Sequence, residues 1–231
     1  MNFLHRLAAA FFPPLCSCCR HPLLYHSGEK HICTPCLMSW PRPTYTDVAD
    51  NMIARRFWGV FPIAAAASAF LYAPGGIMSP VIRKIKYLSQ KNLCQYLGEI
   101  MALEPLPAEL LHDADALIPV PLTPQRMRQR GYNQSAELCV GISRQTHLPI
   151  IDGVLQRKSF SSSQTQKSGN ERAENVRGAF YLSDAKLLRG KHVVIVDDIM
   201  TTGATLLECL MALRDVPDIK ISILTLCQTT S

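Results

Sequence analysis

The part of the sequence that most constrains the fold is residues 192–205, HVVIVDDIMTTGAT. Its apolar, β-branched start predicts a buried strand, and Asp197 and Asp198 follow at the carboxyl end of that strand. A Thr/Gly turn and the start of a helix come next. Because ligands of open α/β sheets bind beyond the carboxyl ends of the strands, the run predicts a binding site as well as a fold class.

The turn after the strand has the chemistry of a phosphate cradle. A helix N-terminus offers unpaired backbone N–H groups and the positive end of the helix dipole, and a glycine lets the backbone approach an anion closely. The two acids would repel a phosphate, so we expect them to face a neighbouring sugar and accept hydrogen bonds from its hydroxyls. The alternative is a turn in which Thr201 merely caps a helix and the acids are solvated. The predicted phosphate-binding residues are Thr201, Thr202, Gly203, Ala204 and Thr205.

Two common phosphate-binding motifs do not fit this turn. The Walker motif would end in Gly-Lys-Ser/Thr, and the dinucleotide fingerprint would contain G-x-G-x-x-G, neither of which the run contains. The order here, with acids before the cradle, therefore indicates another class of phosphate ligand.

The rest of the chain reads as strands that alternate with helices, which is typical of a parallel α/β sheet. A basic polar loop is expected at 123–132, after a short strand. The expected strands are 60–72, 116–120, 149–155, 178–182, 192–196 and 219–226, and the expected helices are 77–88, 93–103, 134–146 and 206–213.

A cysteine-rich segment precedes this domain. Residues 14–45 hold five cysteines, three histidines and five prolines with little apolar periodicity. Two C-x-x-C pairs separated by thirteen residues are typical of a tetrahedral zinc site, whose binding energy would fold such a segment. The predicted ligands are Cys16, Cys19, Cys33 and Cys36.

The exact ligand set has alternatives. Cys18 creates a second register, and His21, His26 or His31 would each be able to replace a cysteine; a redox pair or free thiols are the other interpretation. We expect residues 1–45 to form this module together with a short N-terminal helix at 7–12 that docks on the protein, and residues 46–231 to form the main domain.

Composition narrows the class of protein. The net charge of +6 favours anionic partners such as nucleotides, diphosphates or nucleic acid. The longest apolar stretch, 60–73, is too short for a transmembrane helix and contains Pro62, so no membrane span is expected. Nine cysteines, clustered at the start and otherwise scattered singly, do not resemble a disulfide framework, and a reducing cytoplasm fits them best.

The Asp-Asp to Thr/Gly run resembles the signature of type I phosphoribosyltransferases, and the resemblance extends to the ComF family over residues 15–227. It implies a parallel-sheet, Rossmann-like phosphoribosyltransferase domain after a small zinc ribbon. The residues that carry it besides the cysteines and the 197–205 loop are Ile118-Pro119-Val120-Pro121, Arg130-Gly131-Tyr132-Asn133-Gln134, Gln164-Thr165, Arg172, Asn175 and Ala179-Phe180.

The resemblance also implies a ligand, phosphoribosyl diphosphate (PRPP) or a related ribose phosphate, with Mg²⁺. Asp197 and Asp198 would be the catalytic pair on the ribose, and the loop after an early strand would bind the diphosphate. Pentosyl transfer and ligand sensing without turnover both stay open. The implied diphosphate-binding residues are Arg126, Arg128 and Arg130, and those of a flexible hood over the reaction centre are Arg157, Lys158, Lys167 and Arg172.

Membership of the ComF family would imply a role in DNA uptake and natural transformation. The alternative function is a non-catalytic factor that binds single-stranded DNA or recombination proteins through its basic surface. Its candidate phosphate contacts are Arg55, Arg56, Arg83, Lys84, Lys86 and the arginines of 126–130, with few aromatic residues between them.

Overall fold

The computed structural model describes residues 13–23, 29–158 and 178–230. Four parallel strands form the main sheet in the order β1-β6-β5-β2, which confirms the predicted parallel α/β class. Two short strands pair antiparallel in a separate hairpin. The sheet strands are β1 (Ala65–Tyr72), β2 (Ala116–Pro119), β5 (His192–Met200) and β6 (Lys220–Thr229), and the hairpin strands are β3 (Leu155–Arg157) and β4 (Phe180–Leu182).

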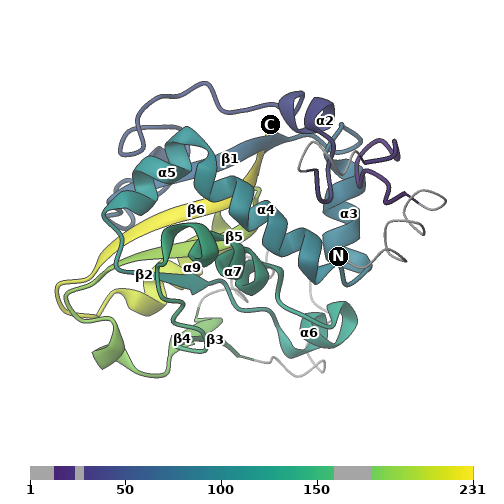
Figure 1. The fold of residues 1–231 in the computed structure, drawn as a ribbon. Coiled ribbons are helices and arrows are strands. Elements are labelled where there is room, and N and C mark those ends of the chain that lie inside the picture. The colour runs from purple at the N-terminus through teal and green to yellow at the C-terminus, as the bar shows by residue number, and fades with distance from the viewer. Residues whose placement is uncertain (1–12, 24–28, 159–177, 231) are drawn as a thin grey trace, which may run out of the picture.

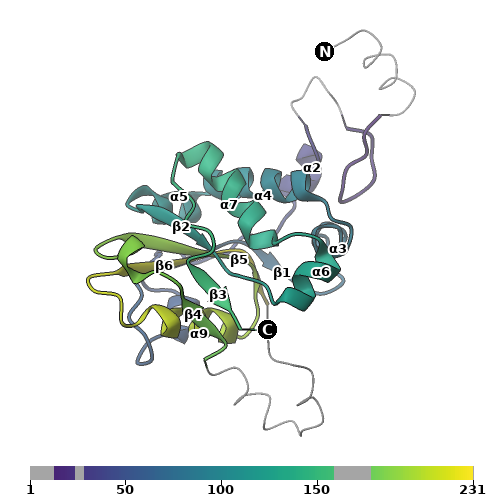
Figure 2. The same cartoon turned by 90° about the horizontal axis from the view of Figure 1, so that it is seen from below.

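The central strand β5 is buried because apolar layers cover both faces of the sheet. Its alternate residues enter different hydrophobic clusters: Val194 and Val196 pack on one side, Val193 and Ile195 on the other. The first side is covered by the helices α4 (Lys91–Leu103), α5 (Pro105–His112) and α7 (Gln134–Thr146), and the second by α9 (Ala204–Leu213) and the β3-β4 hairpin (Figures 1 and 2).

Helices α4 and α7 cross at two glycines. A Cβ atom at Gly141 would lie 1.9 Å from the carbonyl oxygen of Gln95, and one at Gly98 would lie 2.2 Å from that of Leu138. The backbones therefore touch, and only glycine fits at either position. This contact fixes α7, whose first turn reaches the candidate site described below.

Residues 123–132, expected to be a loop, mostly form helix α6 (Pro124–Arg130). Thr123 caps it by accepting a hydrogen bond from the Arg126 amide at 3.2 Å, and proline stands in the first turn, where its missing N–H costs nothing. The expected strand at 149–155 reduces to one bridge between Ile150 and Leu117, while the pairing strand β3 begins at Leu155. Helix α5, which begins at Pro105, was not predicted.

The cysteine-rich segment packs on the main body of the protein. It contains helix α2 (Thr34–Met38), and its residues Cys16, Ile32 and Trp40 belong to the same hydrophobic cluster as α4 and β1. A helix α3 (Ser79–Tyr87) lies beside this segment in Figure 1, and short 3-10 turns occur at Ala54–Arg56 (η2) and Ala185–Leu187 (η4). The N-terminal helix predicted at 7–12 lies outside the described residues.

In the described part of the chain, no helix combines the length and the apolar character needed to cross a membrane.

Candidate functional site

The two adjacent acids lie within β5, near its carboxyl end. The strand continues to Met200 and pairs Asp197 with Thr225 of β6, so the acids belong to the strand instead of following it. An oxygen of Asp197 accepts hydrogen bonds from the Ser135 hydroxyl at 3.0 Å and from the Asp198 amide at 2.9 Å. Burial, together with the neighbouring charge of Asp198, raises the pKa of Asp197 to about 7.

Asp198 has a different environment. Its Oδ1 accepts a hydrogen bond from the Ile199 amide at 2.7 Å. Its Oδ2 lies 3.4 Å from the Lys86 ammonium and 4.0 Å from the Arg130 guanidinium, yet this buried atom accepts no hydrogen bond from any described residue. A buried carboxylate oxygen in that state is an open acceptor beside two cations.

The turn after β5 has the backbone geometry of an anion cradle. Gly203 is the N-cap of α9 with φ +85°, a conformation that a side chain would strain, and it supplies no side-chain cap to the first amides. The Thr202 hydroxyl accepts a hydrogen bond from the Ala204 amide at 3.4 Å, and Arg56 donates to the Thr201 carbonyl at 2.8 Å. Since Gly203 is the cap, the alternative in which Thr201 merely caps the helix does not hold. Residues from Ile199 to Leu206 line a small hollow of about 30 Å³ here, which Asp197 also borders.

The acids, the cradle and part of the basic helix line one cavity of about 260 Å³. Its residues come from α3, from the stretch 120–135, from β3, and from the end of β5 with the turn and α9 that follow it, so segments far apart in sequence meet at one end of the sheet. The lining residues are Lys86, Val120, Pro121, Leu122, Arg126, Arg130, Gln134, Ser135, Arg157, Asp197, Asp198, Ile199, Thr201 and Thr205.

The helical form of α6 separates the three predicted diphosphate-binding arginines. Arg126 and Arg130 are four residues apart, so they share a face and both line the cavity. Arg128 is exposed and is not among the lining residues. Arg130 also donates to the Gln134 side-chain oxygen at 2.7 Å, which fixes its guanidinium beside Asp198.

One of the predicted hood residues reaches the cavity. Arg157, on β3, lines it and stacks over the Phe180 ring at 5.0 Å. Burial and the nearby charge of Arg126 lower the pKa of this guanidinium. Lys158 is exposed and does not line the cavity, while Lys167 and Arg172 lie outside the described residues.

Three polar lining residues were not predicted as part of this site. Lys86 was considered only as a surface contact for DNA phosphates, and Gln134 and Ser135 were read as the start of a helix. Asn133 explains the placement of Gln134 and Ser135. Its side chain caps α7 by accepting a hydrogen bond from the Ser135 amide at 3.1 Å, and it donates a hydrogen bond to the Val120 carbonyl at 3.0 Å.

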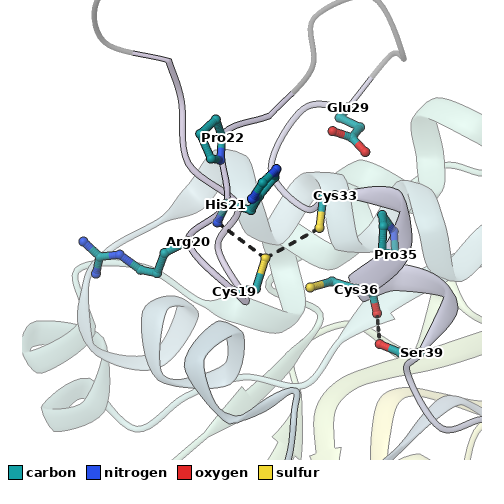
Figure 3. A pocket seen from close by; sticks show the side chains of 9 residues that line it. All are labelled: Cys19, Arg20, His21, Pro22, Glu29, Cys33, Pro35, Cys36 and Ser39. Atoms are coloured by element: carbon teal, nitrogen blue, oxygen red, sulfur yellow. Dashed lines mark hydrogen bonds between the residues drawn. The ribbon is translucent and has the colours of Figure 1, made fainter.

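The four predicted cysteine ligands converge. The sulfur atoms of Cys16, Cys19, Cys33 and Cys36 all lie within 4.8 Å of one another, and Figure 3 shows the last three turned toward a common centre. The Cys19 and Cys33 sulfurs are 3.7 Å apart. Tetrahedral zinc with bonds of about 2.3 Å would hold its sulfurs about 3.8 Å apart, so the cluster fits this ion.

The structure decides among the alternative ligands within the described residues. Cys18 donates its thiol hydrogen to the Ile77 carbonyl at 3.0 Å and is not one of the four clustered cysteines. His31 packs against Tyr96 in a tilted arrangement with 5.4 Å between ring centres. His21 is exposed at the edge of the cluster (Figure 3), where its amide, and no ring nitrogen, contacts the Cys19 sulfur at 3.5 Å. His26 lies outside the described residues.

The electrostatics of the cluster favour a bound cation. Burial acts to raise the pKa of Cys16, but backbone N–H groups of Cys33, Cys19 and Cys18 point at its sulfur and lower the pKa to about 7. Burial and the neighbouring thiols raise the pKa values of Cys33 and Cys36. Four thiols this close cannot all ionise without a cation, because each thiolate opposes the next.

Comparison with known proteins agrees with this geometry. Residues 134–230 match the model of the phosphoribosyl transferase domain family. The chain is 31% identical to the DNA utilization protein YhgH of Shigella flexneri over 94% of this chain and 98% of that one. It is 32% identical to competence protein F of Haemophilus influenzae over 59% of this chain and 62% of that one.

A solved structure of glutamine PRPP amidotransferase from B. subtilis shares 21% identity, with a TM-score of 0.41 over 61% of this chain and 30% of that one. The relatives named above are sufficient to assign the family. The similarity to these relatives extends along the chain, and the matched phosphoribosyltransferase domain contains the acid pair and the cradle of the cavity. This protein therefore belongs to the ComF family.

Proposed function

We propose that the cavity binds PRPP or a closely related ribose phosphate that carries a diphosphate. The observation that carries the proposal is the order of groups along the cavity: an anion cradle, then hydroxyl acceptors, then a basic wall. A 5-phosphorylated ribose diphosphate has the matching order of phosphate, hydroxyls and diphosphate. Few other cellular ligands combine these three features.

Each part of the cavity has a role in this proposal. The Thr201 to Thr205 turn would bind the 5-phosphate, and Asp197 and Asp198 would accept hydrogen bonds from the ribose hydroxyls. Arg126 and Arg130 would bind the diphosphate by charge-assisted hydrogen bonds, with Mg²⁺ bound mainly to the ligand's own oxygens. From the resemblance, Arg128 and the hood residues Arg157, Lys158, Lys167 and Arg172 would add positive charge when the ligand is bound.

Pentosyl transfer at this site would need no covalent nucleophile from the protein. Such a reaction depends on orientation of the anomeric carbon, neutralisation of the leaving diphosphate and exclusion of water. The residues that line the cavity supply the first two, through Asp197 and Asp198 and through Arg126 and Arg130. We therefore propose ligand binding as the activity common to a transferase and a sensor.

The cysteine cluster completes the proposal. We propose that it holds a structural zinc ion, because four sulfurs in closed tetrahedral spacing leave no position for a substrate. All nine cysteines are unpaired, which supports a reducing compartment, the cytoplasm. From the names of the relatives, we propose a role in the use of DNA that a bacterial cell takes up.

A second candidate function is recognition of single-stranded DNA or of a recombination protein, without catalysis. Arg55 lies 5.6 Å from the centre of the exposed Trp58 ring, and Arg83 is exposed on the same helix as Tyr87, whose exposed fraction is 72%. Exposed aromatic rings beside arginines are the groups that bind bases and phosphates of a single strand.

The test is calorimetric titration of the zinc-loaded protein with PRPP and Mg²⁺, beside the double variant Asp197→Asn, Asp198→Asn. We expect the wild type to bind and the variant, shown to be folded by its melting curve, to bind far more weakly. No heat of binding with the wild type would refute the proposal. Titration of single-stranded DNA at two salt concentrations tests the second candidate, since binding through several phosphates must weaken steeply with salt.

A further inference from the structure

Lys86 enters the cavity from the last turn of α3, a helix that was not predicted to reach this site. Its position is fixed by its neighbour. The Ile85 carbonyl accepts hydrogen bonds from the Gln134 side chain at 3.1 Å and from the Tyr132 hydroxyl, and the Ile85 side chain is fully buried. The end of α3 is therefore held against the start of α7, which places the Lys86 backbone beside the cavity.

The Lys86 ammonium balances the negative charge of Asp198 without donating a hydrogen bond to it. The two groups are 3.4 Å apart, and their side chains are only 21% and 13% exposed. Asp198 Oδ2 nevertheless accepts no hydrogen bond from any described residue. Proximity without a hydrogen bond leaves the oxygen's lone pairs available to a ligand hydroxyl, while the positive charge keeps the carboxylate stable in a buried position.

Two other oxygens of the acid pair already accept hydrogen bonds. Asp198 Oδ1 accepts from the Ile199 amide, and Asp197 Oδ1 accepts from Ser135 and from the Asp198 amide. Arg130, the second cation near Oδ2, is 4.0 Å away and hydrogen-bonded to Gln134. Among the described residues, Lys86 is thus the cation closest to this buried oxygen, which remains open.

We propose that Lys86 is a positioning residue of the ligand site, which acts through Asp198 by holding its open oxygen ready for a hydroxyl of the bound sugar. The inference rests on the proposed function and adds a residue to it. It makes the two aspartates unequal: Asp198 offers a buried oxygen that accepts no hydrogen bond from the described residues, whereas one oxygen of Asp197 already accepts two.

The experiment is a double-mutant cycle with PRPP and Mg²⁺ as the probe, measured by calorimetry on Lys86→Met, Asp198→Asn and the double variant. Lys86→Met should weaken binding about tenfold, the scale of a hydrogen bond to a charged group. In the Asp198→Asn background the same change should have almost no effect, because a residue that acts through Asp198 has nothing left to position. Lys86→Arg should recover most of the affinity.

Two further arms keep the test decisive. Pyrophosphate with Mg²⁺ has no sugar hydroxyl, so its affinity should be nearly the same for the wild type and Lys86→Met. Lys84→Met is the matched control, because it removes the same charge from the same helix while Lys84 is absent from the cavity lining. Lys84 acts toward the cysteine-rich segment instead: after burial and the charge of Lys30, its charge helps to lower the pKa of His31. It should bind PRPP like the wild type.

Several results would overturn the inference. A tenfold loss that persists in the Asp198→Asn background, or an equal loss of pyrophosphate binding, would mean that Lys86 contacts the diphosphate directly. A similar loss in Lys84→Met would reduce the effect to net charge. If the wild type itself does not bind PRPP, the proposed function fails and this inference fails with it. If the wild type binds PRPP but the effects of the two substitutions are additive, only this inference fails.

Discussion

Replacement of Gly141 by alanine tests the contact on which the shape of the cavity depends. The added Cβ atom would lie 1.9 Å from the Gln95 carbonyl oxygen and 2.8 Å from the Glu99 amide nitrogen. Both are backbone atoms of α4, so no side chain can swing away. Ordinary contact begins at 3.4 Å, which means that the two helices must separate by about 1.5 Å at this point.

The expected magnitude is the difference between two effects. Overpacking of this kind costs about 1–3 kcal/mol, and two rigid backbone contacts place it near the upper end. Alanine is better than glycine inside a helix by about 1 kcal/mol, which offsets part of that cost. A net loss of about 2 kcal/mol should lower the melting temperature of a chain of this size by about 4–8 °C.

The assay is thermal unfolding followed by circular dichroism. The control is Gln145→Ala, an exposed position of the same helix, where no change beyond about 0.5 kcal/mol is expected. Because Ser135 lies on the first turn of α7 and holds Asp197, Gly141→Ala should also weaken PRPP binding. A variant that melts like the wild type would show that α4 and α7 do not meet at Gly141.

Three other predictions concern the two sites. Metal analysis of the purified, reduced protein should find about one zinc per chain; a folded sample without metal would refute this. Because the pKa of Asp197 is raised to about 7, the folded state holds its proton more tightly than the unfolded chain does. The free energy of unfolding should therefore fall as the pH rises from about 4 to about 7, and urea titrations of Asp197→Asn should lack that part of the fall; equal slopes would contradict it. Arg126→Ala should weaken PRPP binding about tenfold and Arg128→Ala less than about twofold, measured by calorimetry; equal effects would contradict the assignment of faces on α6.

The sequence allowed accurate prediction where the pattern is local. The β-branched run at 192–196 and the Thr/Gly turn after it define a strand and a tight turn without help from distant residues. The predicted end of this strand was too early. Aspartate is disfavoured in strands, and only pairing with β6 carries the strand through Asp197 and Asp198 to Met200. The basic composition of 123–132 indicated a loop, although Thr123 followed by proline is a helix-start signal.

Residues whose roles depend on distant contacts were not predictable. Lys86 and Lys84 are alternate residues of one helix, and no local pattern tells which of them faces the acids. Their difference comes from Ile85, whose carbonyl is held by side chains from the chain segment almost fifty residues later. Cys18 is similar: its spacing allows a second metal register, and only the folded structure shows that its thiol bonds to Ile77 while four other cysteines converge.

Helix α3 joins the two candidate sites physically. Just before its first residue, the Ile77 carbonyl accepts a hydrogen bond from the Cys18 thiol, and in its last turn Lys86 faces Asp198. Beside it, ion pairs from Lys30 to Glu99 at 3.2 Å and from Arg42 to Glu104 at 2.7 Å tie the cysteine-rich segment to α4. These contacts, and the buried cluster that Cys16 and Trp40 share with α4, make it difficult for the segment to unfold alone. A metal ion that orders the cysteines would therefore stabilise the helix that positions Lys86, although the ion and the sugar phosphate would occupy separate sites.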